Sequence, residues 1–164
     1  MGRSNRELAR LYKADQADRK GEIDWSTLRP RDAERRRRVT ELIEAGALAT
    51  GADHFHAAMV FQHGDGLDDF WRAHELARAA VELGHERARS LVAKSYDRWL
   101  MHQGRPQKYG TQYQGVNGRW TLYTVDPATT DDERAEWNIP TLAEALERLN
   151  RMNAERPPRG TAWG

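Results

Sequence analysis

A chain of 164 residues is long enough to form one compact domain around a single core. Its 26 Lys and Arg residues nearly balance its 25 Asp and Glu residues, which excludes a strong overall charge that would attract nucleic acid or an anionic membrane. The lack of cysteine excludes disulfide bonds, thiol nucleophiles and thiolate metal sites. There is no apolar leader and no run of about 18 apolar residues, so we expect a cytoplasmic protein.

The first part of the chain predicts two amphipathic helices. Residues 4–20 place apolar side chains at helical spacing behind a capping pattern of Ser4 and Glu7. A linker that contains Pro30 follows. Asp32 is then expected to cap a second helix.

The middle of the chain predicts three more helices. Asp53 is expected to cap an alanine-rich helix that ends at His63, directly before a Gly-Asp-Gly turn. Two further runs with apolar side chains at helical spacing predict helices over residues 68–83 and from about residue 86 to residue 103.

An internal similarity connects two of these helices. Residues 57–63 (AAMVFQH) align with residues 92–98 (VAKSYDR), an offset of 35 residues that is typical of a helix-hairpin repeat. The small residues and turn of residues 53–103 resemble Sel1-like and tetratricopeptide-like α/α units. About one and a half units are visible, so the resemblance implies a small helical domain with such packing and not a repeat array.

The last part of the chain changes its period. Residues 110–125 alternate apolar and polar side chains around an Asn-Gly turn at 117–118, which predicts a β-hairpin. Thr130 or Asp131 can cap a short helix, and Pro140 lies at the start of a last amphipathic helix.

The whole pattern predicts a mainly α fold. We expect a single domain of packed helices over residues 1–154, with an α/α-hairpin repeat and one small β-hairpin near residues 111–125. Residues 155–164 have too few apolar side chains to bury and are expected to form a flexible tail.

Gln62 and His63 are the first candidate site residues. His63 ends its helix, where the dipole favours a protonated imidazole by roughly 0.3–1 kcal/mol. The histidine can therefore act as an acid or base, or can simply cap the helix. His56 and His63 are two helical turns apart, which is too far for both to bind one metal ion.

Asp97 and Arg98 occupy the position of the repeat that is equivalent to Gln62 and His63. If the equivalent helices pack together, Asp97 could orient His63 for general-base catalysis, as carboxylates do in many hydrolases. The same Asp-Arg pair could also be an ordinary ion pair on a helix surface.

The segment after these helices is unusually rich in uncharged polar groups. Gln107, Tyr109, Thr111 and Gln112 fall within six residues, and side-chain amides are costly to bury unless they form hydrogen bonds. The segment is therefore either a polar knot that holds helices together or the floor of a recognition site.

Several familiar sites are missing from the sequence. It has no phosphate-binding glycine loop, no nucleophile elbow and no paired carboxylates that stand out as an acid/base couple. The arginines at 35–38 are flanked by glutamates and lack interleaved aromatic residues, so they are interpreted as a solvated helix face. We therefore expect no cofactor, no metal ion and no nucleic-acid partner.

The order of these motifs resembles a bacterial family of domains of unknown function that is common in actinobacteria. The resemblance spans most of the chain and implies that the polar motifs form one constellation, without implying an activity. The residues that carry it are Asp53, Gln62, His63, Asp97, Arg98, Gln107, Tyr109, Gly110, Thr111, Gln112, Asp131 and Arg134.

These observations predict a domain that binds a small polar molecule or a peptide in a cleft lined by the motifs. The amides of Gln107 and Gln112 would form hydrogen bonds with the ligand, and Arg98 would bind an anionic group. In an enzymatic version, a hydrolase or transferase would use His63 as general base, oriented by Asp97.

The alternative prediction is a helical module without catalytic activity that binds a partner protein. Its candidate anchors are tryptophans, because this side chain often dominates protein interfaces. They are Trp71, Trp99 and Trp163.

Overall fold

The computed structural model describes residues 2–155 and residue 158. Most of these residues are helical and one small antiparallel sheet is present, which confirms the mainly α fold with a β-hairpin. The chain divides into two compact units, residues 1–92 and residues 93–164. The single domain expected over residues 1–154 stays a prediction, and most of the tail expected at 155–164 lies outside the described residues.

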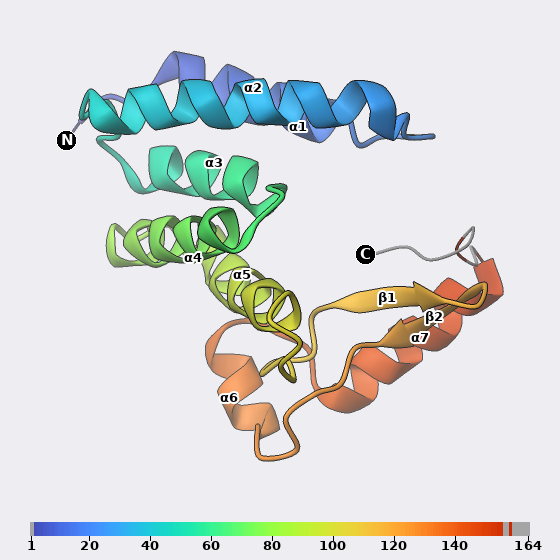
Figure 1. The fold of residues 1–164 in the computed structure, drawn as a ribbon. Coiled ribbons are helices and arrows are strands. Elements are labelled where there is room, and N and C mark those ends of the chain that lie inside the picture. Colours follow the sequence, from blue (N-terminus) through green and yellow to red (C-terminus); the bar gives the residue numbers. More distant parts are fainter. Residues whose placement is uncertain (1, 156–157, 159–164) are drawn as a thin grey trace. The chain divides into compact units, whose positions relative to one another are not determined.

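Helices make up the first unit (Figure 1). The ion pairs Glu7–Arg38 and Asp18–Arg35 connect the first two helices in antiparallel order. The elements of this unit are α1 (Arg6–Ala17), α2 (Trp25–Glu44), α3 (Gly51–Gln62), α4 (Leu67–Glu82), the short 3-10 helix η1 (Glu86–Ala88) and the first residues of α5 (Arg89–Met101).

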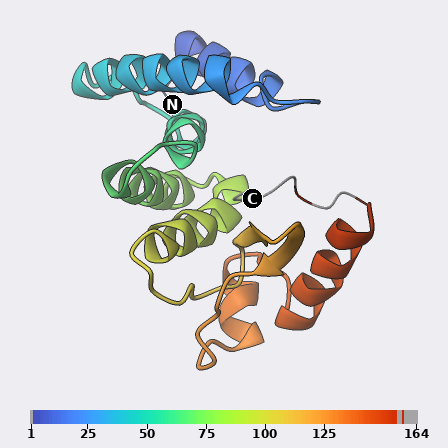
Figure 2. The same ribbon diagram turned by 45° about the vertical axis from the view of Figure 1, so that its right-hand side comes forward.

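The core of the first unit lies where α1, α2, α3 and α4 meet. The buried alanines of α3 and α4 have small side chains, so the two helices can approach closely and pack side by side (Figures 1 and 2). The buried core residues are Leu8, Val39, Leu42, Ala57, Val60, Phe61 and Ala73.

Two predicted helix caps are wrong in this unit. Asn5, not Ser4, caps α1, because its side-chain oxygen accepts hydrogen bonds from the first free backbone N–H groups. Thr50, not Asp53, caps α3, and Asp53 completes a capping box. Asp53 also accepts bonds from Ser4 Oγ and from the backbone N–H of Asn5, at 2.8 Å each, and so holds the start of the chain.

The second helix also begins earlier than predicted. Asp24 caps α2, and Pro30 lies inside the helix instead of in a linker. Asp32, the predicted cap, is buried within α2, where it accepts hydrogen bonds from Arg19 and Arg35. Because the carboxylate of Asp32 is used in these ion pairs, it does not cap a helix, and the start of α2 was therefore predicted too late in the chain.

The arginines at 35–38 do not form a solvated face. The side chains of Arg35 and Arg36 are only 9% and 12% exposed, whereas Arg37 is 58% exposed. Arg36 forms ion pairs with Asp65 and Asp69. Two of the arginines therefore connect α2 to neighbouring elements of the first unit.

The second unit contains a β-hairpin beside a helix (Figure 2). Its strands are joined at Asn117 and Gly118, whose φ angles of 50° and 74° suit the predicted tight turn. Asn153 bonds both backbone groups of Trp120, which fixes α7 against β2. The elements are the rest of α5, β1 (Tyr113–Val116), β2 (Arg119–Leu122), α6 (Asp131–Glu136) and α7 (Leu142–Glu155).

Candidate functional site

Asp97 is the centre of the polar cluster in the second unit. It lies on α5 and is fully buried. Its carboxylate accepts hydrogen bonds from the backbone N–H groups of Lys108, Tyr109 and Thr111 at 2.8, 2.9 and 3.0 Å, and from Thr111 Oγ1 at 2.8 Å. The loop therefore wraps around one carboxylate.

The backbone of Gly110 allows this wrapping. Its φ angle of +85° is one that residues with a side chain rarely adopt. The turn lets the N–H groups of Tyr109 and Thr111 point at opposite oxygens of Asp97. The glycine of the motif is thus explained by the geometry of the loop.

Gln107 closes the base of the same loop. Its side chain is fully buried. The amide nitrogen donates to the carbonyl oxygens of Gln112 and Tyr123 at 3.0 and 2.8 Å, and the amide oxygen accepts from the N–H of Gln112 at 2.8 Å. Gln107 therefore uses its amide inside the protein.

Gln112 and Arg98 form a second layer of this cluster. The amide oxygen of Gln112 accepts a hydrogen bond from Arg98 Nε at 3.1 Å, and the amide nitrogen donates to Thr111 Oγ1 at 3.0 Å. Gln112 is only 3% exposed. Of the two predicted readings of this segment, these contacts favour the polar knot.

Arg134 is a member of the cluster that was not among the predicted site residues. It is buried, and its guanidinium donates to the carbonyl oxygen of Tyr109 at 2.9 Å and to that of Thr129 at 3.0 Å. The sequence motif contained Arg134, but nothing in its spacing showed that it contacts the loop.

Burial and hydrogen bonding act in opposite directions on Asp97. Burial raises the pKa of this carboxyl group, and the hydrogen bonds from Tyr109, Thr111 and Lys108 oppose the shift because they favour the charged form. At Asp53 of the first unit burial also raises the pKa, but the bonds from Asn5, Ser4 and others outweigh it and lower the pKa.

His63 and Gln62 lie in the first unit. The carboxylate beside His63 is Asp15, whose Oδ1 and Oδ2 are 3.1 and 3.0 Å from the ring atom Nδ1. The expected partner Asp97 uses its carboxylate to hold its own loop. Gln62 is buried on α3. Within the first unit, Asp15 is thus a carboxylate that contacts His63, and the orientation of His63 by Asp97 stays a prediction.

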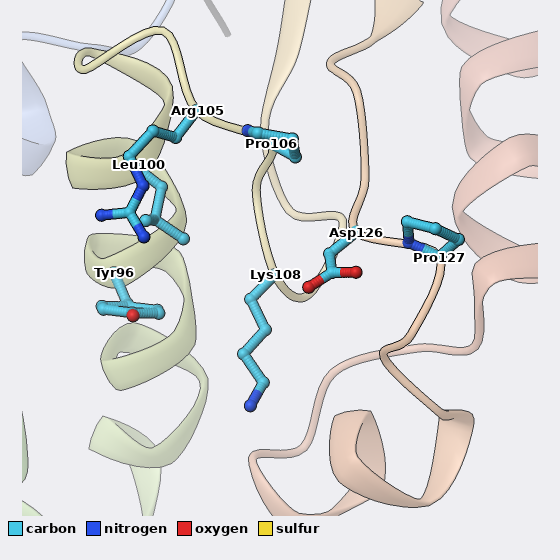
Figure 3. Close-up of a pocket in the computed structure, with 7 residues that line it drawn as sticks. All are labelled: Tyr96, Leu100, Arg105, Pro106, Lys108, Asp126 and Pro127. Atoms are coloured by element: carbon cyan, nitrogen blue, oxygen red, sulfur yellow. The ribbon is translucent and has the colours of Figure 1, made fainter.

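A hollow of about 350 Å³ lies beside the loop of the second unit (Figure 3). Tyr96 and Leu100 of α5 line one side of it together with Arg105, and the side chains of Pro106, Lys108 and residues 126–127 line the other (Figure 3). The lining residues are Tyr96, Leu100, Arg105, Pro106, Lys108, Asp126 and Pro127.

The hollow combines two cations with an aromatic wall. The Tyr96 ring stacks near Trp99, with ring centroids 5.9 Å apart. Lys108 Nζ is 3.2 Å from Glu133, and this hydrogen bond raises the lysine pKa. Arg105 is exposed and lies 6.0 Å from the Trp99 ring. Lys108 is the one lining residue that belongs to the motif at 107–112.

The predicted tryptophan anchors differ in position. Trp71 is 38% exposed on α4, and Trp99 is half-buried on α5. Trp163 lies outside the described residues. Trp25, which was not predicted as an anchor, is 54% exposed.

The chain matches no protein-family model, no curated protein and no solved structure. The resemblances described from the motifs therefore stay predictions. Among the described residues, no helix is both long and apolar enough to span a membrane, and no group of three or more His, Asp or Glu side chains could bind a metal ion.

Proposed function

We propose that the second unit binds a small molecule that joins an anionic group to a flat apolar group. The observation that carries the proposal is the hollow in which Arg105 and Lys108 lie beside the Tyr96 ring. Its volume of about 350 Å³ lies at the lower end of the range for small-molecule sites.

The charges of the hollow favour an anion at one position. Arg105 has no carboxylate partner among the described residues, whereas Lys108 is paired with Glu133. A carboxylate or phosphate of a ligand would bind the guanidinium of Arg105 and add to the charge of Lys108. Asp126 also lines the hollow and would repel a second negative group, so it limits the site to one anion.

The rigid loop supports binding without contacting the ligand directly. Lys108 follows Gln107, whose side chain is held by three hydrogen bonds, and its own N–H is held by Asp97. A site whose walls are already fixed loses little conformational entropy when a ligand binds. The buried motif therefore acts as support for the site, in place of the direct ligand contacts predicted for Gln107 and Gln112.

Benzoate, which carries one carboxylate on a flat ring, is the probe that tests this proposal. Its titration is followed by backbone amide chemical shifts. We expect saturable shifts at Lys108 and Asp126, and about tenfold weaker binding in Arg105→Ala, since a charge-assisted contact contributes about 1.5 kcal/mol or more.

Arg119→Ala is the matched control. Arg119 is exposed at the start of β2 and does not line the hollow, so its removal changes the net charge equally and should leave the affinity unchanged. Equal weakening by both variants, or shifts scattered over both units, would show that benzoate is attracted only by general charge.

A protein-interaction function is the second candidate, and one observation favours it. Leu67 and Trp71 lie one helical turn apart on α4 and are 41% and 38% exposed. Apolar side chains of this size are common anchors in interfaces. Trp71→Ala should leave benzoate binding intact, so the two candidate functions can be tested separately.

A further inference from the structure

The pair of Asp15 and His63 in the first unit is a second chemical site, independent of the hollow. Asp15 lies on α1 and its side chain is 1% exposed, whereas the side chain of His63 is 20% exposed. Both oxygens of Asp15 lie within 3.1 Å of His63 Nδ1. One ring nitrogen thus faces a buried carboxylate.

Other side chains fix the carboxylate of Asp15. Arg19 Nη1 and Gln16 Nε2 each donate to it at 2.8 Å. Arg19 in turn bonds Asp32 at 2.7 Å. This chain of contacts holds the carboxylate of Asp15 in place, because each partner donates a hydrogen bond to it and Arg19 is itself anchored on Asp32.

The contact with the carboxylate of Asp15 determines the tautomer of His63. A carboxylate can only accept hydrogen bonds, so Nδ1 must carry the proton that it donates to Asp15. In the neutral ring, the other nitrogen, Nε2, then carries the lone pair. Nε2 forms no hydrogen bond with the described residues, and the side chain of His63 is 20% exposed.

The backbone at His63 is also fixed. Its carbonyl oxygen accepts a hydrogen bond from Arg36 at 3.3 Å. The next residue, Gly64, has no room for a side chain, since an added Cβ would lie 2.2 Å from Cβ of Asp69. Arg36 also forms ion pairs with Asp65 and Asp69, so it connects α2 to the turn that follows His63.

We propose that His63 is a general base and that Asp15 is its positioning residue. Nε2 takes a proton from a water molecule or a hydroxyl group, and the oxygen that loses the proton attacks an electrophilic carbon. With an ester, the water oxygen forms the new C–O bond, the alkoxide leaves with its electron pair, and the imidazolium then releases the proton to solvent. The carboxylic acid formed then gives its proton to the alkoxide or to solvent, so the products are a carboxylate and an alcohol or its anion.

Hydrolysis of p-nitrophenyl acetate by the full chain tests the base. This small activated ester can react at a partly exposed base without an enclosed pocket, and the release of p-nitrophenolate is measured directly. We expect His63→Ala to lower the protein-dependent rate at least about tenfold. A general base that acts on a bound substrate typically contributes roughly 100-fold or more, and this probe has no dedicated binding site. The rate should also be lower in D₂O, because a proton moves in the step.

His54→Ala is the matched control. His54 lies on the same helix, and its ring nitrogen bonds the carbonyl oxygen of Thr50 instead of a carboxylate. This variant should keep the full rate. Equal rates in wild type and His63→Ala, or a rate that does not change in D₂O, would overturn the proposal.

Asp15→Asn separates positioning from a structural role. The amide nitrogen of asparagine would donate to Nδ1 and place the ring proton on Nε2, which removes the lone pair that accepts the proton. We expect the rate to fall about as far as in His63→Ala. Asp15→Glu should restore part of the rate, because a carboxylate again faces the ring.

Nitrogen-15 NMR of the histidine rings gives a test whose deciding result comes from the wild-type protein. When the His63 ring is neutral, its proton should lie on Nδ1 in the wild-type protein and on Nε2 in Asp15→Asn. A proton on Nε2 in the wild type would overturn the proposal whatever the rates. Binding of benzoate in the second unit has no part in either result, so the two proposals can fail separately.

Discussion

Two buried carboxylates, Asp15 in the first unit and Asp97 in the second, are satisfied in different ways. Neither side chain is accessible to solvent. Asp97 accepts three of its four hydrogen bonds from backbone N–H groups of one loop, whereas Asp15 is bonded by the side chains of Gln16, Arg19 and His63.

The kind of hydrogen-bond partner distinguishes a carboxylate that holds the structure from one that can take part in a reaction. Backbone donors cannot leave without the loop unfolding, so Asp97 holds structure. Of the partners of Asp15, His63 has a second ring nitrogen, Nε2, to which we assign the role of base, and its side chain is partly exposed. A buried carboxylate therefore suggests function when one of its partners can carry a proton outward, and suggests support when its partners are backbone groups.

The largest effect is expected for Asp97→Ala. The loss of the carboxylate leaves the N–H groups of Lys108, Tyr109 and Thr111 without partners, and each buried unsatisfied donor costs about 1–3 kcal/mol. Partial access of water lowers the sum, so we expect the second unit to lose about 3–5 kcal/mol of unfolding free energy. Hydrogen exchange within residues 107–112 in urea measures this loss.

Asp132→Ala is the control for that measurement. Asp132 is exposed in the first turn of α6, where its charge is favourable to the helix dipole, and it forms no ion pair with the described residues. Its removal should cost less than about 1 kcal/mol. If Asp97→Ala costs no more than this control, the loop is held by other contacts and the contrast between the two carboxylates is wrong.

For Asp15→Ala we expect a smaller loss of unfolding free energy, about 1–2 kcal/mol in the first unit. Arg19 keeps its bond to Asp32, and the partly exposed side chains of Gln16 and His63 can turn toward water. Urea unfolding followed by hydrogen exchange in α1 gives the value. A loss as large as that of Asp97→Ala would mean that Asp15 also acts mainly as support.

The parts of the fold that the sequence predicts well are those with local signals. The Asn-Gly turn at 117–118 and the cap at Thr130 determine nearby hydrogen bonds, and both elements occur as expected. The start of α2 was missed because Asp32 is like a capping residue by type, whereas its contacts with Arg19 and Arg35 depend on tertiary packing.

The candidate site was predictable only within one segment. Gln107, Thr111 and Gln112 lie close together in the chain and bond one another, so their density in the sequence already indicated a cluster. Asp15 is 48 residues from His63. An aspartate on a polar helix gives no local sign that it will be buried beside a histidine, so this pair required the structure.

Thr111→Val tests the smallest unit of the Asp97 cluster. The change keeps the shape of the side chain and removes the hydroxyl that donates to Asp97 and accepts from Gln112. We expect a loss of about 1 kcal/mol, because the three backbone bonds remain. Thr124→Val, at an exposed threonine of the same unit, should change the unfolding free energy by less than about 0.5 kcal/mol.

A change of pH should have the smallest effect on the unfolding free energy, because the histidines responsible for it are only partly buried. Burial lowers the pKa values of His56, His74 and His85 in the first unit below the ordinary 6.5. The second unit has one histidine, His102, whose pKa is lowered by burial and by Arg98.

The sign follows from proton uptake. As the pH falls below 6.5, the unfolded chain binds protons that the folded histidines do not, so the unfolding free energy falls until the lowered folded pKa values are passed. Hydrogen exchange at about pH 7.5 and about pH 5.5 should show a larger loss in the first unit than in the second. His74→Gln should reduce that difference, because it removes a ring whose pKa is lowered by burial and whose Nδ1 bonds the carbonyl oxygen of Val92. An equal loss in both units would place the acid sensitivity outside these histidines.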